Sequence, residues 1–447
     1  MSATATTEKK YLKWYQKLAY GSGDLASNCS YGLVSSFVLL YLTGTLGLDS
    51  AIIGSLMLAS KVLDGISDVI FGTLIDRTHS KLGKARPWML FGQVGVSLCL
   101  FLLFAIPAGS TTMQYIYFFI VYTALNAVFY TANGIAYSSL VALITKNNNE
   151  RVQLGSFRFM FAVVTNIFMG FAVTGMVEKF GSGAAGWRTT ALIFAIVGLV
   201  VNTISCLAVK ELPEEELSGN TSEAAEEGKA VAEEKKHGFA ETAKILVHNK
   251  YYLMILAIYI VYYIMSNLTT GAGVFCATYY WGDGSLLGQF SMMKMFPVII
   301  ALAIAPVLIK KTGSMQKVNF WGYAISSVLG IPMIYFAMQK NLSMFLLFMF
   351  IKGVFAGTLS GSLNALIAEA SGYTTRTTGI HMDGMMYSCS SLGVKVGGGI
   401  GTAAVGWLLK LGGFVGTATV QSESAIRMIF NLYITFPFVI GIIITVL

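Results

Sequence analysis

The sequence is poor in charge, histidine and cysteine, and each shortage excludes a class of protein. Charged residues make up only 12% of the 447 residues, about half their share in soluble globular domains. The four histidines fall mostly at expected loops or helix ends, and the five cysteines show no metal-ligand spacing. We therefore expect neither a metal centre built on these residues nor a disulfide framework. The sequence contains no nucleotide-binding motif, which argues against a primary pump.

Long apolar runs dominate the sequence, because 55% of its residues are hydrophobic. Twelve runs reach about 20 residues, which is enough for a helix to cross about 30 Å of hydrocarbon. The sequence therefore predicts an all-α integral membrane protein with twelve transmembrane helices. The runs lie near 25–44, 51–75, 88–107, 114–144, 158–177, 188–209, 251–272, 286–309, 318–338, 343–368, 383–411 and 427–447.

One polar segment, 211–237, separates the first six runs from the last six. We expect an N-terminal six-helix half over 1–209, a cytoplasmic linker with a short interfacial helix over 210–250, and a C-terminal six-helix half over 251–447. Lysine and arginine collect in the loops on one side, which predicts that both termini lie in the cytoplasm. The expected location of the chain is the inner cell membrane. The net charge of +8 mostly reflects this asymmetry, so a lipid bilayer is expected as a partner and a nucleic acid is not. The cations that set the orientation include Lys9, Lys10, Lys13, Lys17, Arg77, Lys81, Lys84 and Arg86.

Three charges, Lys61, Asp64 and Asp68, interrupt one apolar run. At about 100° per helical residue they fall within an arc of about 60°, so they share one face of a helix. Each charge costs about 2.5 to 3.5 kcal/mol at mid-membrane, and such residues usually mark ion or proton pathways. In a simpler interpretation, Lys61 and Asp64 form an ion pair that allows the helix to insert into the membrane. This interpretation leaves Asp68 unexplained.

The segment Gly72-Thr-Leu-Ile-Asp76-Arg77 and the basic residues after it resemble the loop between helices 2 and 3 of the major facilitator superfamily. In that superfamily two six-helix halves enclose a substrate site at mid-membrane. The resemblance implies that this loop helps to latch the cytoplasmic face. The gate residues that it implies are Gly72, Asp76, Arg77, Lys84 and Arg86.

Five segments make the resemblance more specific, to the glycoside-pentoside-hexuronide:cation symporters, and the similarity covers essentially the whole chain. These segments are YGSGDLASN (20–28), KVLDGISDVIFG (61–72), KLGKARPW (81–88), YSSLVALIT (137–145) and YSCSSLGVKVGGGIG (387–401).

The resemblance implies a coupling site at Asp64 and Asp68, which match the two cation-binding carboxylates of that family. Their oxygens suit Na⁺, for which both would be metal ligands, and a buried carboxylate can carry H⁺ instead. Lys395 matches a lysine on helix 11 that neighbours the acidic site, although it can equally be a structural ion-pair partner. No cofactor is implied besides the coupling ion, H⁺ or Na⁺.

The same resemblance places a sugar site among helices 1, 4, 5 and 11. Asn28 and Gly134 occupy the positions at which a galactoside-binding member of that family has carboxylates. This difference argues against binding of a galactoside in the same way. The remaining cavity is neutral or positive and suits an anionic sugar, because an arginine can bind a carboxylate through two parallel hydrogen bonds. Arg158 can instead serve the cytoplasmic gate. The implied substrate-binding residues are Asn28, Tyr31, Asn133, Tyr137, Arg158 and Lys395.

Two further lysines, Lys294 and Lys352, lie within apolar runs of the second half. Either can snorkel to a membrane interface. Lys352 lies deeper in its run and is the better candidate for a cavity residue.

The implied function is secondary active symport of a small-molecule glycoside with H⁺ or Na⁺, by alternating access of the two halves of a monomer. The substrate is an acidic glycoside such as a glucuronide or, alternatively, a neutral pentoside or galactoside. An enzyme is not expected, because no nucleophile or metal constellation accompanies the paired carboxylates. A non-transporting membrane sensor on the same fold is the alternative from another class.

Overall fold

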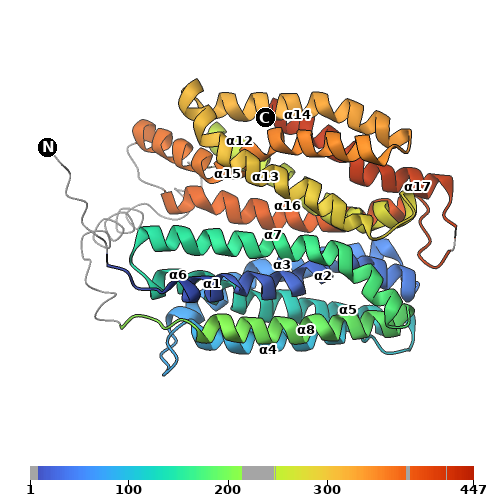
Figure 1. The fold of residues 1–447 in the computed structure, drawn as a ribbon, viewed down its shortest axis with the longest axis horizontal. Coiled ribbons are helices and arrows are strands. Elements are labelled where there is room, and N and C mark those ends of the chain that lie inside the picture. Colours follow the sequence, from blue (N-terminus) through green and yellow to red (C-terminus); the bar gives the residue numbers. More distant parts are fainter. Residues whose placement is uncertain (1–8, 214–245, 247, 379–382, 419) are drawn as a thin grey trace. The chain divides into compact units, whose positions relative to one another are not determined.

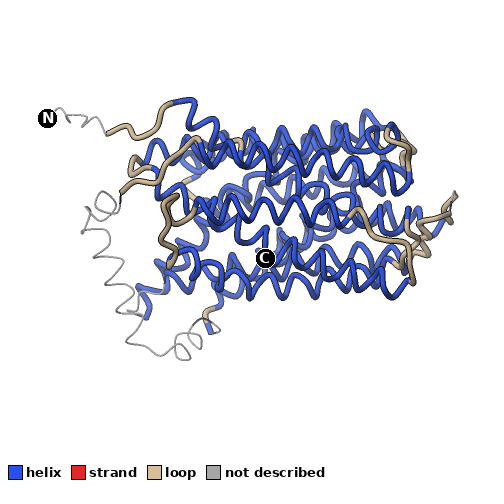
Figure 2. The backbone as a smooth tube through the Cα atoms, turned by 90° about the horizontal axis from the view of Figure 1, so that it is seen from below, coloured by secondary structure: helices blue, strands red, loops and turns tan. Residues whose placement is uncertain are grey.

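The computed structural model describes residues 9–213, 246, 248–378, 383–418 and 420–447. Helices and connecting loops make up this part of the chain, and it contains no strand (Figure 1, Figure 2). Helices are expected for segments in hydrocarbon, because a helix satisfies its backbone hydrogen bonds internally. The predicted all-α fold is confirmed. Most of the predicted linker and its interfacial helix fall outside the described residues.

The chain divides into two compact units, which we describe separately. The first comprises Met1–Tyr41 and Ala59–Asn220, and the second comprises Leu42–Leu58 and Thr221–Leu447. Residues 42–58, which we expected in the N-terminal half, thus group with the second unit. Ser50 donates a hydrogen bond to the Gly406 carbonyl at 2.9 Å. A Cβ atom on Gly54 would lie 2.7 Å from the Ala403 carbonyl oxygen.

The first unit is a bundle in which α4 packs on α6 and α8, while α2 packs on α7 and α8. Hydrophobic side chains and small residues at these contacts allow close approach of the helices. Its helical elements are α1 (Trp14–Gly21), α2 (Gly23–Leu40), the later part of α3 (Ser50–Asp76), α4 (Arg86–Leu103), α5 (Thr111–Thr123), η2 (Ala124–Tyr130), α6 (Thr131–Ile144), α7 (Asn148–Lys179) and α8 (Gly183–Leu207).

In the second unit α12 packs on α16, and α15 packs on both α13 and α14. The helix α15 continues beyond the apolar run predicted to end near 368. The elements of this unit are most of η1 (Tyr41–Thr45), the start of α3, α12 (Lys250–Phe275), η3 (Cys276–Tyr280), α13 (Leu286–Thr312), α14 (Met315–Met338), α15 (Leu342–Thr378), α16 (Asp383–Leu411), α17 (Glu423–Phe430), η4 (Asn431–Thr435) and α18 (Phe436–Val446).

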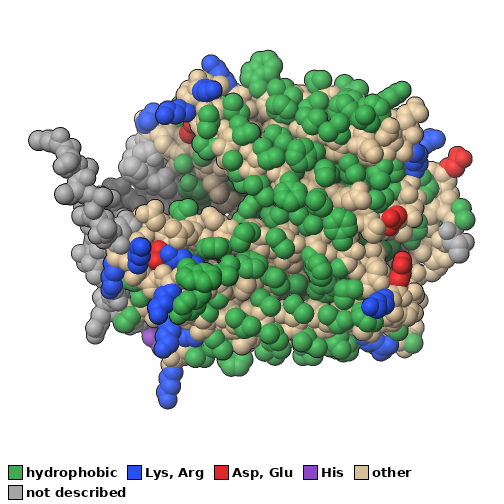
Figure 3. Space-filling view, viewed as in Figure 1, with side chains coloured by type: hydrophobic (Ala, Val, Ile, Leu, Met, Phe, Trp, Pro, Cys, Tyr) green, Lys and Arg blue, Asp and Glu red, His purple; other side chains and the backbone are tan. Residues whose placement is uncertain are grey.

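Eleven helical stretches of the described chain are long and apolar enough to cross a membrane. The twelfth predicted span is α3, which has 27 residues and a length of about 40 Å, but contains the three charges at 61, 64 and 68. Its Val62 and Val69 side chains, on the side away from these charges, are 62% and 73% exposed. Elsewhere hydrophobic side chains cover the helix surfaces, and lysine and arginine lie near helix ends (Figure 3). These features are those of a multi-pass membrane protein.

Candidate functional site

Asp64 lies midway along α3 and contacts two side chains of the first unit. Lys61 Nζ lies 3.4 Å from Asp64 Oδ2, and the Thr131 hydroxyl donates a hydrogen bond of 2.7 Å to Asp64 Oδ1. The Lys61 and Asp64 side chains are only 19% and 14% exposed. Asp68 is partly buried one turn further along α3. The simple Lys61–Asp64 pair therefore exists, but Asp64 also reaches a helix distant in sequence.

Thr131 is the first residue of α6 and directly follows the π-helical segment η2. Its Oγ1 lies 2.9 Å from the Asn126 carbonyl oxygen, and both residues are buried. A carboxylate, a hydroxyl and a carbonyl oxygen thus lie close together beside this π-helical segment. In transporters, backbone carbonyls that are not used in regular helical hydrogen bonds commonly contribute to the sites of the coupling ion. Sequence reasoning missed Thr131, although a polar residue in an apolar run was a usable signal.

Two tyrosines, Tyr31 and Tyr122, lie near Lys61, and the rings of Tyr31 and Tyr130 stack with centroids 5.6 Å apart. Tyr31, predicted to bind substrate, therefore lies beside the charges predicted to bind the cation.

Arg158 on α7 forms an ion pair that we did not predict. Its Nε lies 2.6 Å from Asp24 Oδ2, and the two side chains are 26% and 17% exposed. Its guanidinium also lies over the Tyr137 ring, 4.2 Å from the centroid. The charge of Arg158 is therefore compensated by Asp24 in this structure. Asp24 lies in the segment YGSGDLASN, so its acidic side chain in an apolar helix was the available signal.

Tyr137, another predicted substrate residue, is 2% exposed and is joined to Tyr20. The Tyr137 hydroxyl donates to the Tyr20 carbonyl at 2.8 Å, and the Tyr20 hydroxyl donates to the Tyr137 carbonyl at 2.6 Å. Glycine is required beside this pair, because a Cβ on Gly23 would lie 2.8 Å from the Tyr137 ring. The other glycine of the YGSGD segment, Gly21, is close to α7, where a Cβ on it would lie 2.6 Å from the Phe157 Cβ.

The two predicted asparagines make different contacts. The Asn28 Oδ1 accepts a hydrogen bond of 2.9 Å from Asn166 on α7, and Asn28 is partly buried. Asn133 is 3% exposed and donates to the Met89 carbonyl at 3.0 Å and to Gln93 at 3.1 Å. It thus holds α6 against α4, and its role in substrate binding stays a prediction.

The predicted gate segment is held at one end by Glu211. The carboxylate of Glu211 accepts hydrogen bonds from the backbone N–H groups of Lys84, Ala85 and Arg86, at 2.7, 2.9 and 3.1 Å. It therefore caps the start of α4, where unpaired N–H groups favour a negative charge. Arg86 is buried and donates to the Cys206 carbonyl at 3.1 Å. The other predicted gate residues are partly buried Gly72 and exposed Asp76 and Arg77.

Lys395, predicted beside the acidic site, lies on α16 of the second unit and is partly buried. Asp64 and Asp68 belong to the first unit, so the pairing of Lys395 with them stays a prediction. Among the described residues, no three His, Cys, Asp or Glu side chains gather as a metal-binding cluster. The proposed Na⁺ ligation by Asp64 and Asp68 likewise stays a prediction.

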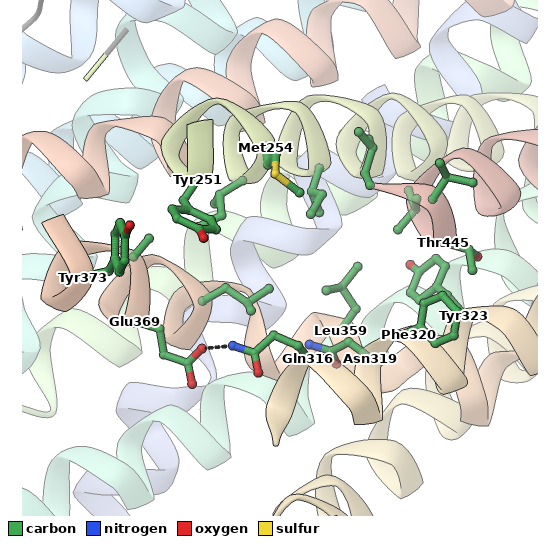
Figure 4. Close-up of a pocket in the computed structure, with 17 residues that line it drawn as sticks. Tyr251, Met254, Gln316, Asn319, Phe320, Tyr323, Leu359, Glu369, Tyr373 and Thr445 are labelled. Carbon is green, nitrogen blue, oxygen red and sulfur yellow. Dashed lines mark hydrogen bonds between the residues drawn. The ribbon is translucent and has the colours of Figure 1, made fainter. Parts of the chain in front are cut away.

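The second unit contains two cavities of interest. The larger, about 560 Å³, is lined by residues of α12, α14, α15 and α18 (Figure 4). Its walls are mainly apolar and aromatic, and the Glu369 carboxylate in its lining accepts a hydrogen bond from Gln316. The smaller cavity, about 180 Å³, is lined by Lys294, Lys352 and several hydroxyl groups. Charge, rather than volume, makes the smaller cavity the better candidate for a polar ligand.

Comparison with known proteins agrees with this architecture. The family model described as MFS/sugar transport protein matches residues 19–447. The uncharacterized symporter YnaJ of Bacillus subtilis (strain 168) is 26% identical over 410 residues, which cover 91% of this chain and 85% of that relative. The isoprimeverose transporter of Lactiplantibacillus pentosus is 26% identical over 435 residues, which cover 96% of this chain and 87% of that relative.

Solved structures show the same fold. A bacterial homologue of the human lysosomal transporter Spinster, inward-facing and unoccupied, superposes with a TM-score of 0.70 at 13% identity, covering 97% of this chain and 95% of that chain. The similarity of fold, the family match over nearly the whole chain and the motif segments agree with one another. The chain therefore belongs to the MFS/sugar transport protein family and, within it, to the glycoside-pentoside-hexuronide:cation symporters that its motifs resemble.

Proposed function

We propose that this protein is a symporter that couples entry of a glycoside to H⁺ or Na⁺, by alternating access, and that it is not an enzyme. It acts as a monomer in the inner cell membrane, with both termini in the cytoplasm. The family match supports sugar transport, and two similar proteins are a symporter and an isoprimeverose transporter.

The observation that carries the proposal is the environment of Asp64. Its carboxylate contacts the Lys61 ammonium and the Thr131 hydroxyl, midway along α3. A cation that binds Asp64 and Asp68 competes with Lys61 for the same carboxylate oxygens. Cation binding thus weakens the contact between Lys61 and Asp64 and forms new contacts between the cation and the two carboxylates. This exchange of contacts provides a route by which cation binding is coupled to the conformational change.

The proposal is tested by uptake of labelled glycosides into proteoliposomes with an imposed Na⁺ or pH gradient. We expect the wild type to accumulate sugar with one gradient, which identifies the ion. Asp68→Asn should abolish accumulation, whereas the matched variant Asp283→Asn, at an exposed loop, should not. Concentrative uptake by Asp68→Asn at the wild-type rate would refute the assignment of the coupling site. A wild type that moves no solute would instead favour the sensor alternative.

A second candidate substrate class is a neutral pentoside or galactoside. The similarity to an isoprimeverose transporter favours a neutral sugar. Uptake of matched acidic and neutral glycosides in the same proteoliposomes separates the two classes.

A further inference from the structure

Two lysines on different helices line one small cavity in the second unit. Lys294 lies on α13 and Lys352 lies on α15, and both are partly buried. Hydroxyl groups from Tyr262 and Thr269 of α12 and from Ser360 of α15 line the same cavity. The cavity thus combines two cations with neutral hydrogen-bonding groups.

Among the described residues, no Asp or Glu side chain lines this cavity. The helices α12, α13, α14 and α18 contain no Asp or Glu, and α15 contains only Glu369. Glu369 lies about 25 Å along α15 from Lys352, at 1.5 Å per residue. Within the described part of the chain, Lys294 and Lys352 have no ion-pair partner. Lys294 Nζ instead donates to the hydroxyls of Thr269 and Thr270, at 3.4 and 3.1 Å.

Close packing fixes the two lysines relative to each other. Gly353 follows Lys352, and a Cβ on it would lie 2.8 Å from the Pro297 Cβ of α13. One turn further along α15, a Cβ on Gly357 would lie 2.6 Å from the Ala301 Cβ. Backbones that approach this closely pack rigidly. The lysines are therefore held beside a common space.

Two like charges in an apolar environment repel each other, and each is costly without a partner. An anion between them offsets both costs and gains charge-assisted hydrogen bonds. The volume of about 180 Å³ corresponds to the share of about six water molecules. It accommodates an acidic group and neighbouring hydroxyls, and it is smaller than the roughly 300–1,000 Å³ of sites that enclose a whole drug-sized ligand.

We propose that Lys294 and Lys352 form an anion subsite that binds the acidic group of the transported glycoside. This inference rests on the proposed function and assigns recognition of the acid to the second unit. In the first unit Arg158 is paired with Asp24, so its charge is already compensated. The cation and the acid thus have separate sites, the former on α3 and the latter between α13 and α15.

The test is binding of matched glycosides to the full-length protein in nanodiscs, measured by isothermal titration calorimetry. The probes are 4-nitrophenyl β-D-glucuronide and β-D-glucoside and the corresponding galacturonide and galactoside, which share an aglycone and differ in the acidic group. We expect the wild type to prefer an acidic probe. Lys352→Gln and Lys294→Gln should each weaken its binding at least tenfold while changing affinity for the neutral probe less than twofold. Lys352→Arg should retain the preference, and Lys311→Gln, at an exposed position on α13, should leave both affinities unchanged.

Retained binding of the neutral probe shows that a variant is folded. Absence of an acidic preference in the wild type for both pairs would overturn the inference, as would equal losses for acidic and neutral probes in the Gln variants. Lysine-dependent binding of inorganic phosphate without lysine-dependent binding of an acidic glycoside would also overturn it, because the anion would not be the cargo. Cation-driven uptake of a neutral glycoside alone refutes the subsite but keeps the proposed function. Lysine-dependent glucuronide binding without cation-driven uptake keeps the subsite but refutes the proposed function.

Discussion

Replacing Arg158 by Gln should destabilise the first unit, because it leaves the Asp24 carboxylate partly buried without its partner. Unit charges about 4 Å apart attract each other by about 4 kcal/mol at an effective dielectric constant of about 20. Removing one partner of a buried pair costs about 3 to 5 kcal/mol. Because these side chains are 26% and 17% exposed, we expect a loss of about 2 to 3 kcal/mol in the free energy of unfolding.

A double-mutant cycle in mixed micelles measures this pairing. Asp24→Asn and Arg158→Gln should each be destabilising, whereas the double variant should lose less than the sum of the two, with a coupling energy of about 1 to 2 kcal/mol. Arg188→Gln, which removes an exposed arginine on α8, is the matched control and should have little effect. Single effects that add within about 0.5 kcal/mol would refute the pairing.

Substrate assays separate the substrate-binding role predicted for Arg158 from its role as the partner of Asp24. If its charge serves Asp24, then Arg158→Gln should reduce binding of a glucuronide and of the matched glucoside by equal factors. A loss confined to the glucuronide would show that Arg158 contacts the acidic group itself, against this reasoning.

Three further predictions concern other contacts. Thr131→Val should weaken binding of the coupling cation about tenfold, because Asp64 loses its hydroxyl neighbour, and cation titration of sugar binding measures the change; unchanged affinity would exclude Thr131 from the site. Glu211→Ala should cost about 1 to 2 kcal/mol of stability through loss of the α4 cap, with faster hydrogen exchange of the backbone amides at 84–86; unchanged exchange would contradict the cap. Burial raises the pKa of Asp49, but hydrogen bonds from Lys410 and two backbone N–H groups outweigh it and lower the pKa below its usual value. The contribution of Asp49 to stability should therefore be present above pH 4 or so and be lost as pH falls through the lowered pKa, and Asp49→Asn should remove this part of the acid dependence of unfolding.

The sequence alone predicted the helices well, because apolar runs of membrane length leave the backbone few alternatives. It also placed Lys61, Asp64 and Asp68 on one face of α3, since helical periodicity depends only on local spacing. The Lys61–Asp64 contact followed directly from that spacing.

Contacts between distant residues could not be predicted in the same way. The pairing of Asp24 with Arg158 joins residues 134 positions apart, and the approach of Thr131 to Asp64 depends on the π-helical turn of η2, which changes the register of α6. Neither apolar periodicity nor composition specifies such a register. The grouping of 42–58 with the second unit depends similarly on glycine contacts along α16.

Asn133 illustrates a different difficulty. A polar residue in an apolar run indicates that the side chain avoids lipid, but it does not show whether the side chain faces a cavity or another helix. The structure places Asn133 against Met89 and Gln93, which the sequence could not distinguish from a substrate contact.

The most direct measurement of coupling at Asp64 and Asp68 is the cation flux that accompanies sugar entry. Proteoliposomes with low buffering capacity receive a transported glycoside, and external pH and Na⁺ are recorded together with sugar uptake. We expect H⁺ or Na⁺ to enter together with the sugar in the wild type, and no coupled flux in the Asp64→Asn/Asp68→Asn variant. Sugar entry without cation flux in the wild type, or unchanged coupled flux in the variant, would contradict the assignment of these carboxylates as the coupling site.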